Sequence, residues 1–238
     1  MHPLLRETLA AGYTVVADVR LATLEFARSL GEVFTARPDD EPIVTVKIDG
    51  DDAATTSYAS SRCAELSLHT DYATFTEPPR FTITRCIEPD PDYPNKGRSI
   101  VVKIDRVVEH LRSNEPGLDR ILRTSPVPFR RNAEHERFHG EVPRFPVLDE
   151  QSRVRFDATL ITPVLGGEDR PDRAELLDAV SRFERLCHRH GERVEVALDR
   201  CDVLIIDNRR VVHSRSECTY RRDGERLVSR EVDLAFLC

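Results

Sequence analysis

Short apolar segments rich in β-branched residues, each bounded by turn-forming residues, recur along most of this 238-residue chain. They are residues 43–48, 80–87, 99–104, 193–198, 203–206 and 227–236. Runs of this length and composition predict β-strands. Strands that return after helical segments, with few helices among them, favour a β-barrel or sandwich. The sequence therefore predicts a mainly β fold with flanking helices.

Hydrophobic periodicity predicts few helices. Apolar side chains recur at helical spacing over residues 18–31 and over residues 171–190, and a shorter helix is expected from Asp105. Residues 153–156 and 159–161 are interpreted as two further strands.

No internal repeat or linker divides the chain, so we expect one domain over residues 1–238. Its N-terminal part of helices and strands is expected to span about residues 1–60. Its β core is expected to span about residues 61–238, with a helical insertion at about residues 172–190.

Composition excludes several classes of protein. No apolar run reaches the roughly 20 residues that a membrane-spanning helix needs, so no membrane partner is expected. The net charge is −7 and the arginines are scattered among acidic residues, which argues against a nucleic-acid partner. The six cysteines form no C-x-x-C pair, and the N-terminus has no secretory pattern. We therefore expect a cytoplasmic protein with reduced thiols.

An alternating apolar segment precedes His69-Thr70-Asp71, a candidate metal-binding pair. Side chains two residues apart on a strand share one face. Random placement of 8 histidines and 42 acidic residues would give roughly 1.4 such pairs, and the chain has three. The pairs that begin at His139 and His190 have a central glycine and fit polar surface turns. The pair at His69 also fits a strand-end histidine packed against a carboxylate, so it does not establish a metal site alone.

A second group of polar residues lies near the C-terminus. The apolar segment 203–206 runs into a turn, and His213 follows that turn. Arg226 comes 13 residues later, and Arg230 lies four residues beyond it. If residues 226–230 form a strand, both guanidinium groups face one side. This layout predicts a pocket that holds an imidazole and two guanidinium groups, and His69 and Asp71 are expected to share it. Two histidines and one carboxylate bind iron(II) and leave coordination positions open.

Other metal or catalytic patterns are weaker. His135 and His139 could share a helical face, but the sequence has no H-E-x-x-H motif, so a surface helix is the better interpretation. Cys187, His188 and His190 resemble a metal cluster by composition only, and Cys187 belongs to the apolar stripe of a helix. No Gly-x-Ser-x-Gly motif or Walker loop is present, which excludes a serine hydrolase and a P-loop protein of those types.

Several stretches occur in the order that one family shows. They are residues 66–79, the Gly97-Arg98-Ser99 turn, residues 207–213, Arg226 and Arg230. Over roughly residues 60–236 the chain resembles the taurine dioxygenase/clavaminate synthase-like Fe(II)- and 2-oxoglutarate-dependent oxygenases. The resemblance implies a double-stranded β-helix (jelly-roll) core with His69, Asp71 and His213 as iron ligands.

The same resemblance implies roles for three more residues. Arg226 matches the arginine that pairs with the distal carboxylate of 2-oxoglutarate, and a planar guanidinium suits a carboxylate. The family has a Gly-Gly-x-Thr turn whose threonine shares that carboxylate. Here Lys96 replaces the first glycine, and Ser99 keeps the hydroxyl group. Arg230 is expected to bind an anionic group of the primary substrate, with a salt bridge at the rim as the alternative.

The implied reaction consumes O2 and 2-oxoglutarate, releases succinate and CO2, and oxidises an unactivated C–H bond of a small molecule. Hydroxylation is the default, with desaturation or ring closure as alternatives. An anionic or zwitterionic substrate such as an amino acid or a natural-product intermediate is expected, with Tyr72 among the residues that bind it. Residues 50–63 and 72–79 are the candidate lids. Because Asp71 is present, halogenation is not expected.

Two alternatives stay open at this point. One is a jelly-roll binding protein without catalysis, and the other is a cupin-like metalloenzyme that does not use 2-oxoglutarate. The oligomeric state is also open, with a homo-oligomer as one alternative.

Overall fold

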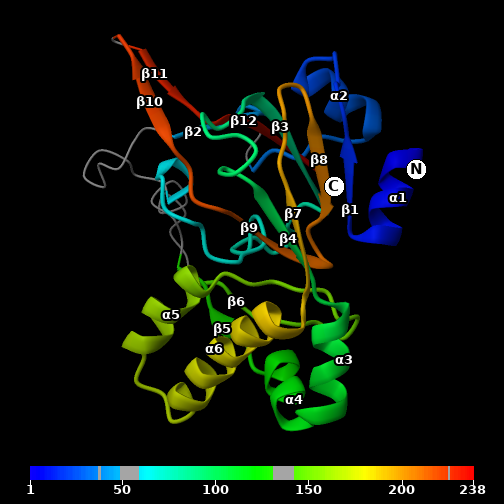
Figure 1. Ribbon diagram of the computed structural model, residues 1–238. Coiled ribbons are helices and arrows are strands. Elements are labelled where there is room, and N and C mark those ends of the chain that lie inside the picture. Colours follow the sequence, from blue (N-terminus) through cyan, green and yellow to red (C-terminus); the bar gives the residue numbers. More distant parts are fainter. Residues whose placement is uncertain (37–38, 49–58, 131–141, 225) are drawn as a thin grey trace.

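The computed structural model describes residues 1–36, 39–48, 59–130, 142–224 and 226–238 (Figure 1). The helices are α1 (Pro3–Ala11), α2 (Thr23–Leu30), α3 (Asp105–Asn114), α4 (Pro116–Thr124), α5 (Ala158–Gly167) and α6 (Arg173–His190), with a 3₁₀ turn at Ala59–Ser61. The strands are β1 (Tyr13–Val16), β2 (Val44–Lys47), β3 (Phe81–Glu88), β4 (Ser99–Lys103), β5 (Val127–Pro128), β6 (Arg144–Phe145), β7 (Glu192–Val196), β8 (Val203–Asp207), β9 (Val211–Arg215), β10 (Tyr220–Asp223), β11 (Arg226–Ser229) and β12 (Glu231–Leu237).

Two antiparallel sheets face each other. The larger has the strand order β1-β8-β3-β12-β2, and the smaller has the order β7-β4-β9. Leu204 and Ile206 of β8 share one buried cluster with Val101 of β4 and Val211 of β9. This cluster closes one part of the space between the sheets. Each of these side chains contributes about 1.5–3 kcal/mol when it is fully buried.

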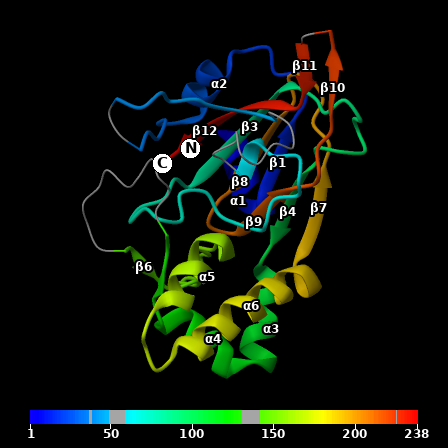
Figure 2. The ribbon, with the colours of Figure 1, turned by 90° about the vertical axis from the view of Figure 1, so that its left-hand side faces the viewer.

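Helices lie on the outer face of the larger sheet and at one end of the sandwich (Figures 1 and 2). α1 and α2 pack on the larger sheet, where Phe81 and Ile83 of β3 point outward into their cluster. Helices α3 to α6 pack together at that end, and Ile100 and Val102 of the smaller sheet share a buried cluster with them. Because side chains alternate along a strand, Thr82 of β3 points to the space between the sheets. The functional residues described below lie in that space.

The hairpin of β10 and β11 projects from the sandwich as a separate two-stranded ribbon (Figure 1). Its register pairs Asp223 with Arg226 at the tip, and every residue of β10 is exposed. The strand predicted over residues 227–236 is thus two strands, β11 and β12, which are separated by Arg230.

The predicted strand at residues 159–161 is wrong, because these residues belong to α5. Asp157 caps this helix: its Oδ1 accepts hydrogen bonds from the Thr159 and Leu160 amides at 2.9 and 3.3 Å. The local capping signal outweighs the β-branched composition. Residues 153–156 form no strand either; Val154 makes one isolated bridge.

Other expectations hold with small shifts. The predicted strands at 43–48, 80–87, 99–104, 193–198 and 203–206 correspond to β2, β3, β4, β7 and β8. The predicted helices correspond to α2, α3 and α6, although α2 begins at Thr23 and not at Asp18. Helices α1 and α4 were not predicted. In the described part of the chain, no helix is long and apolar enough to cross a membrane.

Candidate metal centre

His69 and His213 are cross-strand neighbours. The His69 amide donates to the His213 carbonyl at 2.9 Å, and the His213 amide donates to the His69 carbonyl at 2.8 Å. Such a directly opposed pair places both side chains on one face. The ring centroids are 4.4 Å apart. Two residues that are 144 positions apart in the chain are thus held as one unit by main-chain hydrogen bonds.

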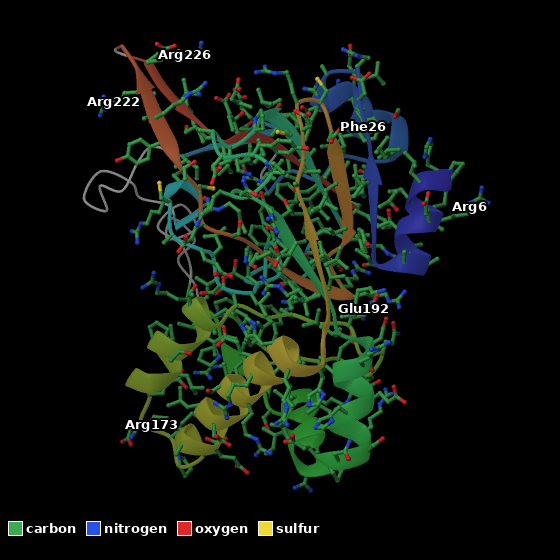
Figure 3. All side chains as sticks on the ribbon, in the orientation of Figure 1. Arg6, Phe26, Arg173, Glu192, Arg222 and Arg226 are labelled. Carbon is green, nitrogen blue, oxygen red and sulfur yellow. The ribbon has the colours of Figure 1, made fainter. Side chains whose placement is uncertain are left out.

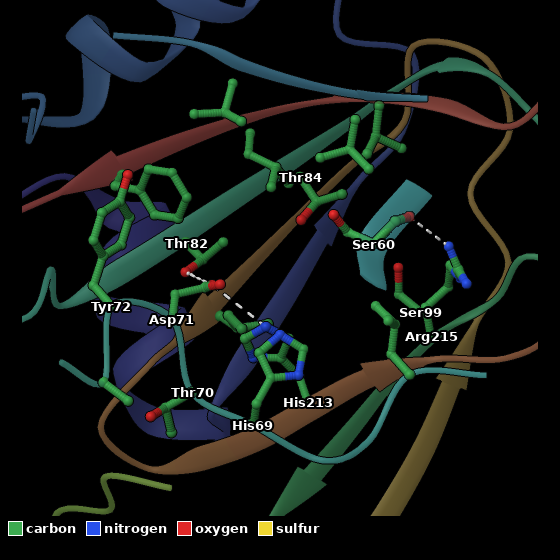
Figure 4. Close-up of a pocket in the computed structure, with 18 of the residues that line it drawn as sticks. Ser60, His69, Thr70, Asp71, Tyr72, Thr82, Thr84, Ser99, His213 and Arg215 are labelled. Atoms are coloured by element: carbon green, nitrogen blue, oxygen red, sulfur yellow. Dashed lines mark hydrogen bonds and ion pairs between the residues drawn. The ribbon is translucent and has the colours of Figure 1, made fainter. Parts of the chain in front are cut away.

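Asp71 completes a group of three ligands (Figure 4). Its Oδ2 lies 3.3 Å from Nε2 of His213, and one candidate ligand atom from each of His69, Asp71 and His213 lies within 4.8 Å of the other two. Two imidazole nitrogens and one carboxylate oxygen suit iron(II) and leave positions for other ligands. The donor set therefore fits the metal that the sequence predicts.

Neighbouring side chains fix Asp71 in place. The Thr82 hydroxyl donates to Oδ2 of Asp71 at 2.6 Å. Asn208, which is 2% exposed, accepts from the Asp71 amide at 2.8 Å and donates to the Asp71 and Pro79 carbonyls at 3.0 and 3.1 Å. Supporting hydrogen bonds of this kind orient a metal ligand and raise the affinity of the site.

The charge states of Asp71 and His69 suit a metal. Burial tends to raise the pKa of Asp71, but the His213 and His69 imidazoles and the Thr82 hydroxyl together hold it well below its usual range. Burial, followed by the neighbouring His213, lowers the pKa of His69. Nδ1 of His69 lies 2.9 Å from the Ser67 carbonyl, so a proton on Nδ1 leaves Nε2 free to bind a metal. A carboxylate and neutral imidazoles are the forms that bind metal ions.

The triad lies in the wall of a cavity of about 1070 Å³ between the two sheets. Cavities that bind small molecules usually measure roughly 300–1,000 Å³, so this one has room for two small ligands at once. Apolar side chains of the larger sheet form much of the wall: Leu204, Ile206, Val232, Leu234 and Phe236.

Arg230 and Ser99 also line this cavity. Arg230 is 7% exposed, and among the described residues its guanidinium has no hydrogen-bond or salt-bridge partner. Burial lowers the pKa of this guanidinium, which remains a cation. Gly97 allows the arginine to lie here, because a Cβ atom on it would come within 2.9 Å of Cδ of Arg230 and 2.8 Å of Cβ of Asp90. Its φ of +66° also favours glycine.

Arg226 lies elsewhere. It is exposed on β11, and Figure 3 shows it at the end of the projecting hairpin. The expectation that Arg226 and Arg230 share one face is therefore wrong. The alternation rule requires one continuous strand, and the chain leaves β11 at Ser229 before Arg230 turns into the cavity.

Tyr72 lines the cavity directly after Asp71. Its ring packs edge-on against Phe34, Phe75 and Phe236, with centroid distances of 5.1, 5.0 and 4.8 Å. Burial, with the carboxylates of Asp71 and Asp40, raises the pKa of Tyr72 to about 12. The phenol is therefore a neutral hydrogen-bonding group at physiological pH.

Sequence reasoning missed Arg215, which lies two residues after His213 on the same face of β9 and lines the cavity. Its guanidinium donates to the carbonyls of Ser60, Arg62, Ala64 and Ser216. The even spacing from His213 is the signal that could have identified it. Its donors hold the segment that leads to His69.

Among the described residues, the remaining candidate ligands lie apart from the triad. His135 and His139 lie outside the described residues, as does most of the candidate lid at 50–63. His190 stacks on His110 with centroids 4.0 Å apart, and Cys187 is buried among the helices, as predicted. Within the described ranges, the triad is the one group of three or more potential metal ligands.

Comparisons with known proteins agree with this geometry. The model of the family described as taurine catabolism dioxygenase TauD, TfdA family, matches residues 4–230. No curated protein sequence matches the chain.

Solved structures with similar folds include two amino-acid oxygenases. An asparagine oxygenase in complex with Fe(II), 3-hydroxyasparagine and succinate is 20% identical, with a TM-score of 0.69, over 98% of this chain and 78% of that one. The non-heme iron oxygenase OrfP in complex with Fe and α-ketoglutaric acid is 21% identical, with a TM-score of 0.69, over 98% and 77%. The predicted jelly-roll fold is thus confirmed. Because the family model spans nearly the whole chain, this protein belongs to the TauD/TfdA dioxygenase family.

Proposed function

We propose that this protein, a 2-oxoglutarate-dependent dioxygenase, hydroxylates a C–H bond of a small amino-acid-like molecule, with His69, Asp71 and His213 as the ligands of iron(II). The observation that carries the proposal is the clustering of the three ligand atoms within 4.8 Å at the wall of a large cavity. Iron(II) bound there supplies the oxidative chemistry that couples the conversion of 2-oxoglutarate to succinate and CO2 with C–H oxidation.

Arg230, together with Ser99, is the better candidate for the distal carboxylate of 2-oxoglutarate. A buried guanidinium without a described partner needs an anion, whereas Arg226 is exposed on a hairpin. The planar guanidinium can donate two parallel hydrogen bonds to a carboxylate, and the Ser99 hydroxyl can donate a third. In this assignment Arg230 has the role that the sequence suggested for Arg226.

The protein residues around the iron site position the reactants and exclude water. Thr82 and Asn208 hold Asp71 through hydrogen bonds, and the apolar side chains of the larger sheet exclude water from the cavity. Arg155 donates to the carbonyls of Phe75 and Thr76 and so fixes the segment after Tyr72, the remaining candidate lid. A rigid, dry pocket restricts the oxidation to the C–H bond that faces the metal.

An amino acid is the substrate class that we favour. Asparagine oxygenase and OrfP, named above, are crystallised with hydroxylated amino acids. Hydroxylation is the default outcome for the same reason, and desaturation or ring closure would need the same triad.

The test is spectroscopic and chemical. Protein loaded anaerobically with Fe(II) and 2-oxoglutarate should show the weak visible absorption band of the chelate, and O2 should then yield succinate. His213→Ala should abolish both signals, and His190→Ala, which alters a histidine outside the triad, should keep both. A cupin-like enzyme would turn over without 2-oxoglutarate and would be indifferent to Arg230→Ala. Absence of the band and of succinate from the wild type would refute the proposal.

A further inference from the structure

Asp157 is a carboxylate beside the triad for which the reaction above has no use. It forms an isolated antiparallel bridge with His69, and it lines the cavity. Its Oδ1 accepts hydrogen bonds from the Thr159 amide at 2.9 Å, the Thr159 hydroxyl at 2.6 Å and the Leu160 amide at 3.3 Å. Among the described residues, Oδ2 has no hydrogen bond and no ion pair. The helix cap thus orients the carboxylate and leaves one oxygen available.

The cavity is lined by cations that have or would gain partners, and by carboxylates that lack a salt bridge among the described residues. Its cations are Arg215, whose donors are occupied by four carbonyls, and Arg230, which the co-substrate would neutralise. Its carboxylates outside the triad are those of Asp40, Glu41 and Asp157. Among the described residues, none of these three has a salt bridge. A second ligand would therefore meet unpaired negative charge.

Asp40 lies on the side of the cavity away from Arg215. Asp40 acts on Tyr72, whose pKa it helps to raise. Figure 4 shows Tyr72 on the opposite side of the triad from Ser99 and Arg215. With 2-oxoglutarate at the basic end, the space on the Tyr72 side of the metal ligands is left to the primary substrate. An anionic substrate would be repelled there, since like charges disfavour binding.

We propose that the primary substrate carries a positively charged ammonium or guanidinium group on its side chain, and that Oδ2 of Asp157 binds this group. The inference rests on the proposed function and narrows its substrate class to basic amino acids. A fixed carboxylate oxygen forms a charge-assisted hydrogen bond with such a cation. A neutral analogue of the same shape leaves Asp157 desolvated and unpaired, so the site discriminates by charge. Asp157 is then a specificity-determining residue.

The test compares substrates of equal shape and different charge. The enzyme loaded anaerobically with Fe(II) and 2-oxoglutarate is titrated with L-arginine and its neutral analogue L-citrulline, and with L-lysine and its neutral isostere L-2-aminoheptanoic acid. We expect at least one cation to bind about 10- to 100-fold more tightly than its neutral partner, and to stimulate succinate release when O2 is added.

Asp157→Asn separates charge from capping, because asparagine and aspartate cap helices about equally well. It should keep the melting temperature and reduce the cation preference to near unity, and Asp157→Ser should do the same. Asp172→Asn is the control for loss of charge alone: Asp172 precedes α6 outside the cavity, so the substitution should leave the preference unchanged.

Three results would overturn the inference: equal or tighter binding of the neutral partners, a cation preference that survives in both Asp157 variants, or no binding of any of the four compounds. Failure of the proposed function looks different. If the visible band forms and Arg230→Ala removes it, the oxygenase assignment stands even when the charge preference is absent. If the band never forms, the oxygenase assignment itself has failed.

Discussion

Arg230 offers a sharp prediction, because its side chain is a buried cation without a described partner. We consider Arg230→Met, which keeps an unbranched chain next to Gly97 and removes the charge. Replacing buried charge with well-packed apolar groups is often neutral or stabilising by about 1–4 kcal/mol. Without co-substrate, the variant should therefore be at least as stable as the wild type.

Addition of 2-oxoglutarate should make the wild type more stable than the Arg230→Met variant. A ligand at 100 times its Kd stabilises a protein by about 2.7 kcal/mol, and 1 kcal/mol shifts the melting temperature of a chain this long by about 2–4 °C. The wild type should thus gain about 5–10 °C. Loss of a buried carboxylate partner costs about 3 kcal/mol of binding, or about two decades in Kd, so the variant should gain almost nothing.

The assay is thermal unfolding in the presence of manganese(II), with and without 2-oxoglutarate. Arg226→Met is the control, since Arg226 is exposed and should leave the ligand-induced shift intact. The reasoning is refuted if the ligand-free Arg230 variant melts several degrees below the wild type, or if 2-oxoglutarate stabilises it as much as the wild type. A shift that disappears in the Arg226 variant would restore the assignment suggested by the sequence.

Three further substitutions test the support of the site. Thr82→Val removes the donor to Asp71 and should weaken metal binding roughly tenfold in a chelator competition; unchanged affinity would contradict the supporting role. Asn208→Ala leaves buried amide and carbonyl groups unpaired and should lower the free energy of unfolding in urea by about 2–4 kcal/mol; a loss below about 0.5 kcal/mol would contradict the account. Gly97→Ala should raise the Kd of 2-oxoglutarate at least about tenfold, because the new Cβ displaces Arg230. Its control, Gly166→Ala, meets nothing within 4 Å and should have little effect on Kd.

The triad could be predicted because its motifs occur in the order of one family, since spacing alone did not separate His69-Thr70-Asp71 from two similar pairs. Spacing of two residues places His69 and Asp71 on one side of an extended segment, and the turn after β8 leads directly to His213. The structure brings these three side chains together. What the sequence did not reveal is the pairing: His69 lies outside any named strand and meets His213 through one isolated bridge.

Arg230 and Asp157 show where sequence reasoning reached its limit. The spacing of Arg226 and Arg230 suggested one strand, but the end of the hairpin separates them, and a strand break leaves no strong local signal. Around Asp157, β-branched Thr159 and Ile161 suggested a strand, whereas the Asp cap starts a helix. Long-range packing decides where Arg230 points, whereas the cap at Asp157 is a local signal that the β-branched composition obscured.

A structure of the protein crystallised anaerobically with Fe(II) and 2-oxoglutarate would place both ligands at once. The account predicts iron on His69, Asp71 and His213, and the distal carboxylate of 2-oxoglutarate at about 3 Å from the Arg230 guanidinium and the Ser99 hydroxyl. Iron bound elsewhere, or a distal carboxylate held by a different cation while Arg230 stays unpaired, would contradict it.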